Sequence, residues 1–186
     1  VLTPTAGMAA WWKADALALA NNDPVALWSD SSPNGHDIAQ GTAAAKPTFK
    51  TNQVGGKPAI VFDGGDNLIA SDAGMPTGDL SVICVVYAAN LPVSSYYGIL
   101  CYGTSGIGKM VFVMYSNVSP GSQGLGISQY GASLTINNST GAWYIFSAVR
   151  AGTSYNLWRN NGSNASGTMI TNTVLYGAGG MAIGSF

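Results

Sequence analysis

Charged side chains are scarce in this chain of 186 residues. Asp, Glu, Lys and Arg together make up 8% of it, whereas roughly a quarter of the residues of a typical soluble domain carry such side chains. Glutamate is absent, and no acidic residue follows Asp79. From Leu80 onward the charged residues are Lys109, Arg150 and Arg159. Hydroxyl and amide side chains must keep that part soluble, which suits an extracellular, polymer-facing or assembly-embedded protein better than a cytosolic monomer.

The missing charge clusters and the missing long apolar runs exclude two kinds of partner. The net charge is −1 and no basic run occurs, so we expect no nucleic-acid binding. No apolar run approaches the ~20 residues that cross a bilayer, and no signal-peptide pattern opens the chain, so we expect no membrane insertion. Because Val1 is not an initiator methionine, we expect the chain to be processed, excised or only partly represented.

Helical periodicity is also nearly missing, and short strand-like segments take its place. The strongest is residues 80–88, whose apolar run is typical of a strand covered on both faces. Asn160-Asn161-Gly162 predicts a hairpin turn after a strand at residues 153–159. The expected strands are residues 8–15, 25–28, 59–62, 67–70, 80–88, 98–102, 109–115, 124–130, 142–150, 153–159, 168–175 and 181–186. This pattern predicts one all-β domain, a two-sheet antiparallel sandwich.

Three segments near the N-terminus carry a pattern of their own. They are Trp11–Asp15, the polar turn cluster Trp28–Asp37, and the short strand within Gly55–Gly64. In these segments, and in Tyr155–Trp158 before the Asn-Gly turn, the chain resembles LamG-like jelly-roll domains of bacteria and phages. Those domains belong to the concanavalin A-like lectin/glucanase superfamily. The resemblance implies a jelly roll over residues 8–186 after an N-terminal arm or linker at residues 1–7.

The chain departs from this family at its end. Such domains usually continue past an Ile-Gly strand, here Ile183-Gly184, into a final strand and a short helix, whereas this chain stops at Phe186. We therefore expect that the tail is cleaved or disordered, or that another chain supplies the missing edge strand.

Catalysis is not expected from these residues. Glucanases of the superfamily use paired carboxylates, generally glutamates on one strand, and this chain has no glutamate and no acid in its long central strands. Asp63 and Asp66 flank Gly64-Gly65 in a turn, and His36 is the single histidine. The sequence therefore predicts a protein that is not an enzyme.

Calcium is a possible cofactor, although none is required. The resemblance implies it, because related lectin-like sandwiches often bind calcium at a loop rim. Asp30, Asp63 and Asp66 offer oxygen ligands of the kind that calcium prefers. Each of them also has a turn-forming explanation, so both alternatives stay open.

Two cysteines, Cys84 and Cys101, fall in consecutive expected strands. A hairpin centred near Pro92-Val93 would place them about opposite each other, as a disulfide requires. An oxidising location would favour the bond. Free buried cysteines are equally common in such strands, so the sequence leaves both states open.

Aromatic residues carry the ligand hypothesis, because sugars stack on Trp and Tyr rings whose polar tips can also hydrogen-bond. Five of them lie at expected strand ends or loops and are our candidate carbohydrate-binding residues: Trp158, Tyr130, Tyr115, Tyr96 and Tyr97. Packing beneath a loop is the alternative for each. The remaining tryptophans lie within or beside apolar strands and are expected in the core: Trp11, Trp12, Trp28 and Trp143.

Two functions remain. The first is a non-catalytic, lectin-like module of an extracellular, cell-surface or virion protein, which binds a glycan or a cell-surface polysaccharide. The second is a structural virion subunit, such as a capsid decoration or tail-associated protein, in which the jelly roll is an assembly scaffold and the partners are other subunits. Fold analogy does not decide between them.

Overall fold

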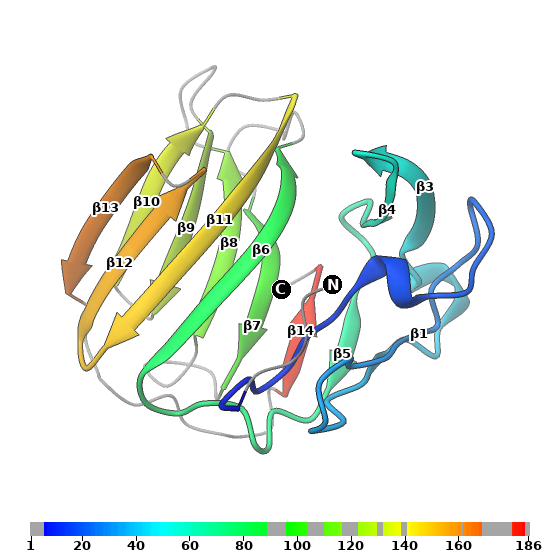
Figure 1. Ribbon diagram of the computed structural model, residues 1–186, viewed down its shortest axis with the longest axis horizontal. Coiled ribbons are helices and arrows are strands. Elements are labelled where there is room, and N and C mark those ends of the chain that lie inside the picture. The colour runs from blue at the N-terminus through cyan, green and yellow to red at the C-terminus, as the bar shows by residue number, and fades with distance from the viewer. Residues whose placement is uncertain are drawn as a thin grey trace. The chain divides into compact units, whose positions relative to one another are not determined.

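Antiparallel strands make up nearly all the regular structure of this chain, for which a computed structural model describes residues 6–88, 96–103, 110–116, 123–129, 132–138, 141–160, 162–168 and 180–184 (Figure 1). The predicted all-β class is confirmed. The chain divides into two compact units. The first unit consists of residues 1–75 and 180–185, and the second of residues 76–179 and Phe186. Within the described residues, no helix has the length and apolarity of a membrane span.

The first unit is built from short strands and two single 3-10 turns. Its strands pair in the order β1-β2-β5-β14, beside a separate β3-β4 hairpin. The elements are η1 (Ala14–Ala16), β1 (Leu27–Trp28), β2 (Ile38–Ala39), η2 (Ala43–Ala45), β3 (Thr48–Val54), β4 (Lys57–Val61), β5 (Leu68–Ala70) and β14 (Met181–Ile183). Val25, Ile38, Phe49, Leu68 and Met181 form its buried core.

Glycine residues on either side of β14 allow close backbone approach in this unit. Gly184 has a φ of +99°, and a Cβ atom there would lie 2.1 Å from the Phe62 ring. Gly180 has a φ of +58°, and a Cβ atom there would lie 2.7 Å from the carbonyl oxygen of Ala70. Only glycine tolerates both the conformation and the crowding, so these two positions fix how β14 joins β5.

The strand expected at residues 8–15 is wrong. The described residues there form only an isolated bridge between Trp12 and Asp30, followed by η1. The amide of Trp11 donates to the Asp30 carboxylate at 2.8 Å, and its carbonyl accepts from Ser31 at 2.7 Å. Because these backbone groups bond to a turn, no strand ladder can form along the segment.

The second unit contains two antiparallel four-stranded arrays. One has the order β7-β8-β9-β10 and the other β13-β12-β11-β6, and Figure 1 shows them as two layers. The strands are β6 (Leu80–Ala88), β7 (Tyr96–Tyr102), β8 (Met110–Ser116), β9 (Gln123–Gln129), β10 (Ala132–Asn138), β11 (Ala142–Ala151), β12 (Ser154–Arg159) and β13 (Ser163–Thr168). Strand β10 packs against β12 and β13.

Alternation along β11 defines the core side of its sheet. Tyr144, Phe146, Ala148 and Arg150 are buried, whereas the residues between them are more exposed. Neighbouring β12 buries Tyr155 and Leu157, and the other layer buries Leu100, Tyr102, Ile127 and Ile136. This period of two, with one face buried, is what an antiparallel sheet in a layered fold produces.

The predicted Asn-Gly hairpin forms between β12 and β13. Asn160 has a φ of +50°, and the Gly162 amide donates to the Arg159 carbonyl at 3.1 Å. The return strand begins at once at Ser163 and not at residue 168 as expected. Its sequence, Ser-Asn-Ala-Ser-Gly-Thr, has few β-branched or aromatic residues, so composition does not reveal it.

The hairpin expected between the two cysteine-bearing strands is wrong. Strand β6, with Cys84, pairs with β11, and β7, with Cys101, pairs with β8 in the other array. Consecutive strands here belong to different sheets, and no disulfide joins Cys84 to Cys101. Burial raises the pKa of the Cys84 thiol to about 12, which makes it a poor nucleophile.

Candidate interaction surface

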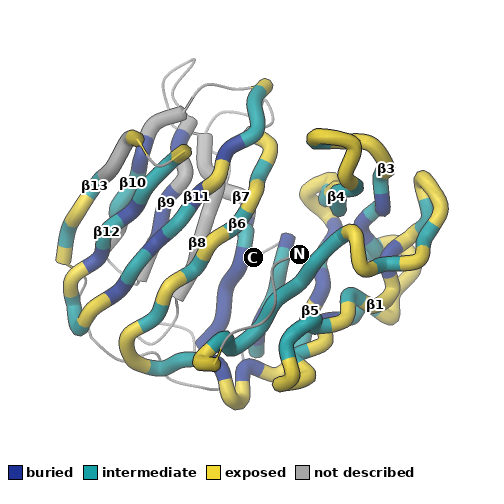
Figure 2. Tube along the Cα trace, in the orientation of Figure 1, coloured by how far each residue is buried: buried dark blue, intermediate teal, exposed yellow. Residues whose placement is uncertain are grey.

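The outer face of the sheet formed by β6, β11, β12 and β13 exposes large apolar side chains. On β6, Ile83 is 73% exposed, Val85 57% and Tyr87 45%. On β11, Ile145 is 53% exposed, and it lies directly opposite Val85 in the register. Figure 2 shows these exposed positions along β6. The prediction that residues 80–88 are covered on both faces is therefore wrong.

Two aromatic rings extend this face toward the end of the sheet. Tyr87 and Trp143 are opposite each other on β6 and β11. Their ring centroids are 5.4 Å apart with an interplanar angle of 57°, a tilted arrangement that aromatic pairs favour. Trp143, expected in the core, is thus a partly exposed cross-strand partner on the outer face.

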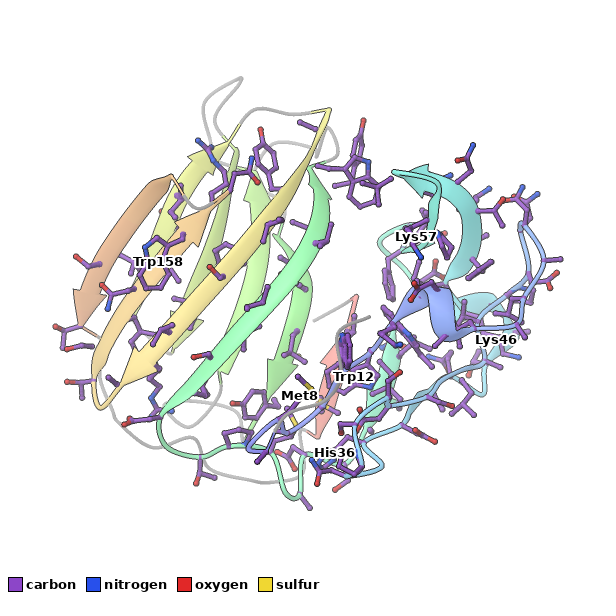
Figure 3. All side chains as sticks on the ribbon, in the orientation of Figure 1. Met8, Trp12, His36, Lys46, Lys57 and Trp158 are labelled. Atoms are coloured by element: carbon purple, nitrogen blue, oxygen red, sulfur yellow. The ribbon has the colours of Figure 1, made fainter. Side chains whose placement is uncertain are left out.

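Trp158 lies on the same face, one strand further along (Figure 3). It is opposite Ser147 on β11 and alternates with the buried Leu157 of β12. Next to it, Asn156 is opposite Ser166 of β13. The outer face therefore changes from aliphatic and aromatic at β6 and β11 to aromatic and polar at β12 and β13.

The outward positions of this sheet carry no charged side chain. Asp, Glu, Lys and Arg are absent from the described positions that alternate with the buried ones: 81, 83, 85, 87, 143, 145, 147, 149, 154, 156, 158, 166 and 168. A contiguous apolar patch without charge is typical of a surface that meets another molecule.

The charge on β11 points into the unit. Arg150 is 1% exposed. Its Nε donates to the Gly152 carbonyl at 3.1 Å, and its Nη1 donates to the Thr77 carbonyl at 3.4 Å. Its guanidinium lies 5.8 Å from the centroid of the Tyr155 ring. Burial raises the pKa of Tyr155, although the nearby Arg150 charge opposes the shift. This arginine ties a loop and a turn together and leaves the outer face neutral.

The predicted carbohydrate-binding residues do not all lie in the same strand array. Tyr96 and Tyr115 are backbone partners on β7 and β8, with Tyr97 beside them, whereas Trp158 belongs to the other array. The side chains of these three tyrosines, and all of Tyr130, lie outside the described residues. Trp158 is thus the one candidate whose side chain is placed, on the outer face.

Asp30, a candidate calcium ligand, organises the polar turn of the first unit. Its Oδ1 accepts the amides of Trp11 and Ser32, and its Oδ2 accepts the Ser32 hydroxyl at 2.6 Å and the His36 amide at 3.0 Å. Burial alone would raise the pKa of Asp30, but these hydrogen bonds outweigh it and hold the pKa below its usual value. Both oxygens of this carboxylate accept hydrogen bonds from within the turn and from Trp11.

Asp63 and Asp66, the other candidate ligands, bond within their own turn. The Gly65 amide donates to Asp63 Oδ1 at 2.8 Å, and the Asp63 amide donates to Asp66 Oδ2 at 3.2 Å. Burial, and the neighbouring Asp63 charge, raise the pKa of Asp66. Over the described ranges, no three His, Cys, Asp or Glu residues gather closely enough to hold a metal ion. Calcium binding stays a prediction.

Sequence reasoning missed the outer face for a physical reason. In β11 both alternating sets of residues are largely apolar, because Trp143 and Ile145 face outward while Tyr144 and Phe146 face inward. Hydrophobic alternation cannot then tell which face is buried. Arg150, the charged residue of this strand, would have pointed to the wrong face, because it belongs to the buried set.

Comparisons with known proteins show a likeness at the level of fold. No protein-family profile matches the chain, and no curated protein sequence does. Two solved structures resemble it: full-length tailspike protein 2 from Escherichia coli O157:H7 bacteriophage CAB120, with a TM-score of 0.51 and 10% identity, and the enzymatically active domain of bacteriophage CBA120 tailspike protein 2, with a TM-score of 0.50 and 9% identity. Both comparisons cover 89% of this chain, which spans 23% and 26% of those chains, about a quarter.

Proposed function

We propose that this chain is a structural module of a virion tail-associated protein, with a jelly-roll sandwich as its assembly scaffold. The fold of this chain resembles part of two phage tailspike chains, and this similarity supports the assignment to the virion tail. The virion surface is then its location, and other subunits are its partners.

The outer face of the β6–β11 pair is the observation that carries an assembly role. Ile83, Val85, Tyr87 and Ile145 are exposed together, on a sheet face whose outward positions lack charge. Removing such apolar surface from water stabilises association at about 25 cal/mol per Å². A face of this kind is costly for a free monomer and favourable in an assembly.

A non-catalytic role is part of the proposal. The chain has no glutamate, and the adjacent carboxylates Asp63 and Asp66 each accept a backbone amide of their own turn. Both are therefore bonded as turn-forming residues are. The proposed function requires no cofactor.

Immunogold electron microscopy tests the proposal. Antibodies raised against the purified chain are applied to particles from the virus or lysogen that encodes it, with pre-immune serum as the control. Gold at the tail is the expected result. Gold confined to the capsid, or unlabelled particles, would overturn the tail assignment.

A second candidate function, a lectin-like adhesion module, is favoured by Trp158. Its ring lies partly exposed on the outer face, beside the amide and hydroxyl positions Asn156 and Ser166. An aromatic platform flanked by neutral hydrogen-bonding groups suits an uncharged glycan.

Thermal unfolding with a panel of neutral glycans tests this candidate. A binding glycan raises the melting temperature of the wild type by ligand linkage, and Trp158→Ala removes the increase. Ser154→Ala, on the same strand and face, should keep it. Indifference of the wild type to every glycan would reject the lectin candidate and leave the assembly role.

A further inference from the structure

We propose that β6 pairs antiparallel with β6 of a second copy of this chain, about a twofold axis at Cys84, and joins two outer sheets into one. This inference rests on the proposed assembly function and names its partner and contact strand.

The edge geometry of β6 is the first step. Strand β6 ends the order β13-β12-β11-β6, so its far side pairs with no other described strand. Its pairing with β11 runs unbroken from Leu80–Arg150 to Ala88–Ala142, without a register shift. An unbroken edge strand of this kind presents a regular row of N–H and C=O groups that no other described strand pairs, which is a template for another strand.

The sequence of β6 lacks the devices that protect free edges. Natural edge strands carry lysine, proline, inward charges or bulges, and residues 80–88, Leu-Ser-Val-Ile-Cys-Val-Val-Tyr-Ala, contain none of them. The opposite edge of the same sheet, β13, is a polar strand of six residues. The two edges of one sheet thus differ, and only β6 has the composition of a buried strand.

The sheet pleat fixes the register of such a pair. Outward residues of one copy must lie opposite outward residues of the other, because a slip by one residue turns every side chain to the wrong face. An axis at Cys84, the middle of the nine residues, pairs the whole strand. It places Ile83 opposite Val85 of the second copy and Ser81 opposite Tyr87 of the second copy.

The outer face then becomes continuous across the axis. Ile83 and Val85, the most exposed apolar residues of β6, become cross-strand partners, and β-branched pairs of this kind stabilise sheets. The outward positions of β6 carry no charged side chain that would repel the same side chain of the second copy. A twofold interface requires a surface that is complementary to itself, and the uncharged outer face of β6 meets this requirement.

Cysteine cross-linking tests the register directly. Two variants of the full chain, Ile83→Cys and Val85→Cys, are made in a Cys84→Ala/Cys101→Ala background and mixed under mild oxidation. The mixture should yield at least about tenfold more disulfide-linked dimer than either variant alone, because Cα atoms beyond ~7 Å cannot be bridged. Ser166→Cys on β13, mixed with Val85→Cys, is the control and should give only the background yield.

Each outcome decides the inference. Equal cross-linking by the single variants, or by the β13 control, would overturn the β6 register, and so would no cross-linking at all. Circular dichroism checks that the Cys84→Ala/Cys101→Ala background and each variant made in it are folded. Failure here, together with gold labelling of the tail, would reject the β6 contact and leave the proposed function standing.

Discussion

At the scale of single residues, Asp30 shows how one carboxylate can specify an irregular segment. Four donors converge on its two oxygens, from Trp11, Ser32 and His36. The Trp12 indole in turn donates to the His36 carbonyl at 2.8 Å. Hydrogen bonds to a charged acceptor are among the stronger ones, so the turn is held without a strand ladder.

Asp30→Asn should lower the free energy of unfolding at neutral pH by roughly 1–3 kcal/mol, because the amide nitrogen of Asn would face donors. The pKa of Asp30 is lowered in the folded state. Its contribution is therefore complete above the unfolded value of 3.8 and is lost as the pH falls through the folded value. Urea unfolding between pH 3 and pH 7 should show a weaker pH dependence in this variant.

Asp66→Asn is the matched control with the opposite sign. The pKa of Asp66 is raised in the folded state, so its contribution is complete below 3.8 and is lost as the pH rises through the folded value. Removing this carboxyl should make the rise of stability from pH 3 to pH 7 larger. The same direction of change in both variants would contradict the assignment.

The sequence identified the polar turn cluster but not what holds it. Turn-forming residue types in Trp28–Asp37 marked an irregular segment. The partners of Asp30 are up to 19 residues away, at Trp11, and no local pattern encodes such a contact. Calcium binding stays a prediction, because turn-forming and calcium-binding aspartates look alike in a sequence.

At the scale of secondary structure, β11 separates the core from the outer surface by alternation alone. Phe146 is 0% exposed, whereas its neighbour Ile145 is among the exposed residues. Both lie in one strand that pairs with β6 and β12. Adjacent residues of the same strand should therefore respond very differently to truncation.

Phe146→Ala should lower the free energy of unfolding by about 3–5 kcal/mol, as is typical of large core residues. Ile145→Ala should cost less than about 1 kcal/mol, because an exposed side chain leaves no cavity. Chemical denaturation of the two variants under conditions that favour the monomer measures both effects. Similar losses would show that the outer face is covered within the chain itself.

Strands with strong composition were predictable, and polar strands were not. The β-branched and aromatic runs gave β6, β11 and β12 within a residue or two of their bounds. Strand β10 has only Leu134 and Ile136 as large apolar residues, and it went unpredicted. This strand forms because it pairs with β9 over seven residues. Such pairing is a tertiary effect that the intrinsic β-propensity of its residues does not predict.

At the scale of the whole molecule, charge is divided unequally between the units. The first unit has seven Asp and four Lys, and the second has Asp79 with Lys109, Arg150 and Arg159. Of the arginines, Arg150 is buried. Net charge usually keeps soluble proteins apart, so the second unit has little to oppose association. The scarcity of charged residues in this unit was evident from the sequence, but the uncharged outer face became clear only from the strand register.

Sedimentation velocity over a range of protein concentrations tests the assembly claim most directly. The wild type should sediment as a dimer. Ile83→Lys/Val85→Lys should sediment as a monomer, because four ammonium groups would meet at the β6 axis and like charges opposite each other destabilise strand pairs. Ser154→Lys/Thr168→Lys adds the same charge to the same face, away from β6, and should remain a dimer. A wild type that is monomeric at every concentration, or a dimer that all three proteins share, would contradict the account.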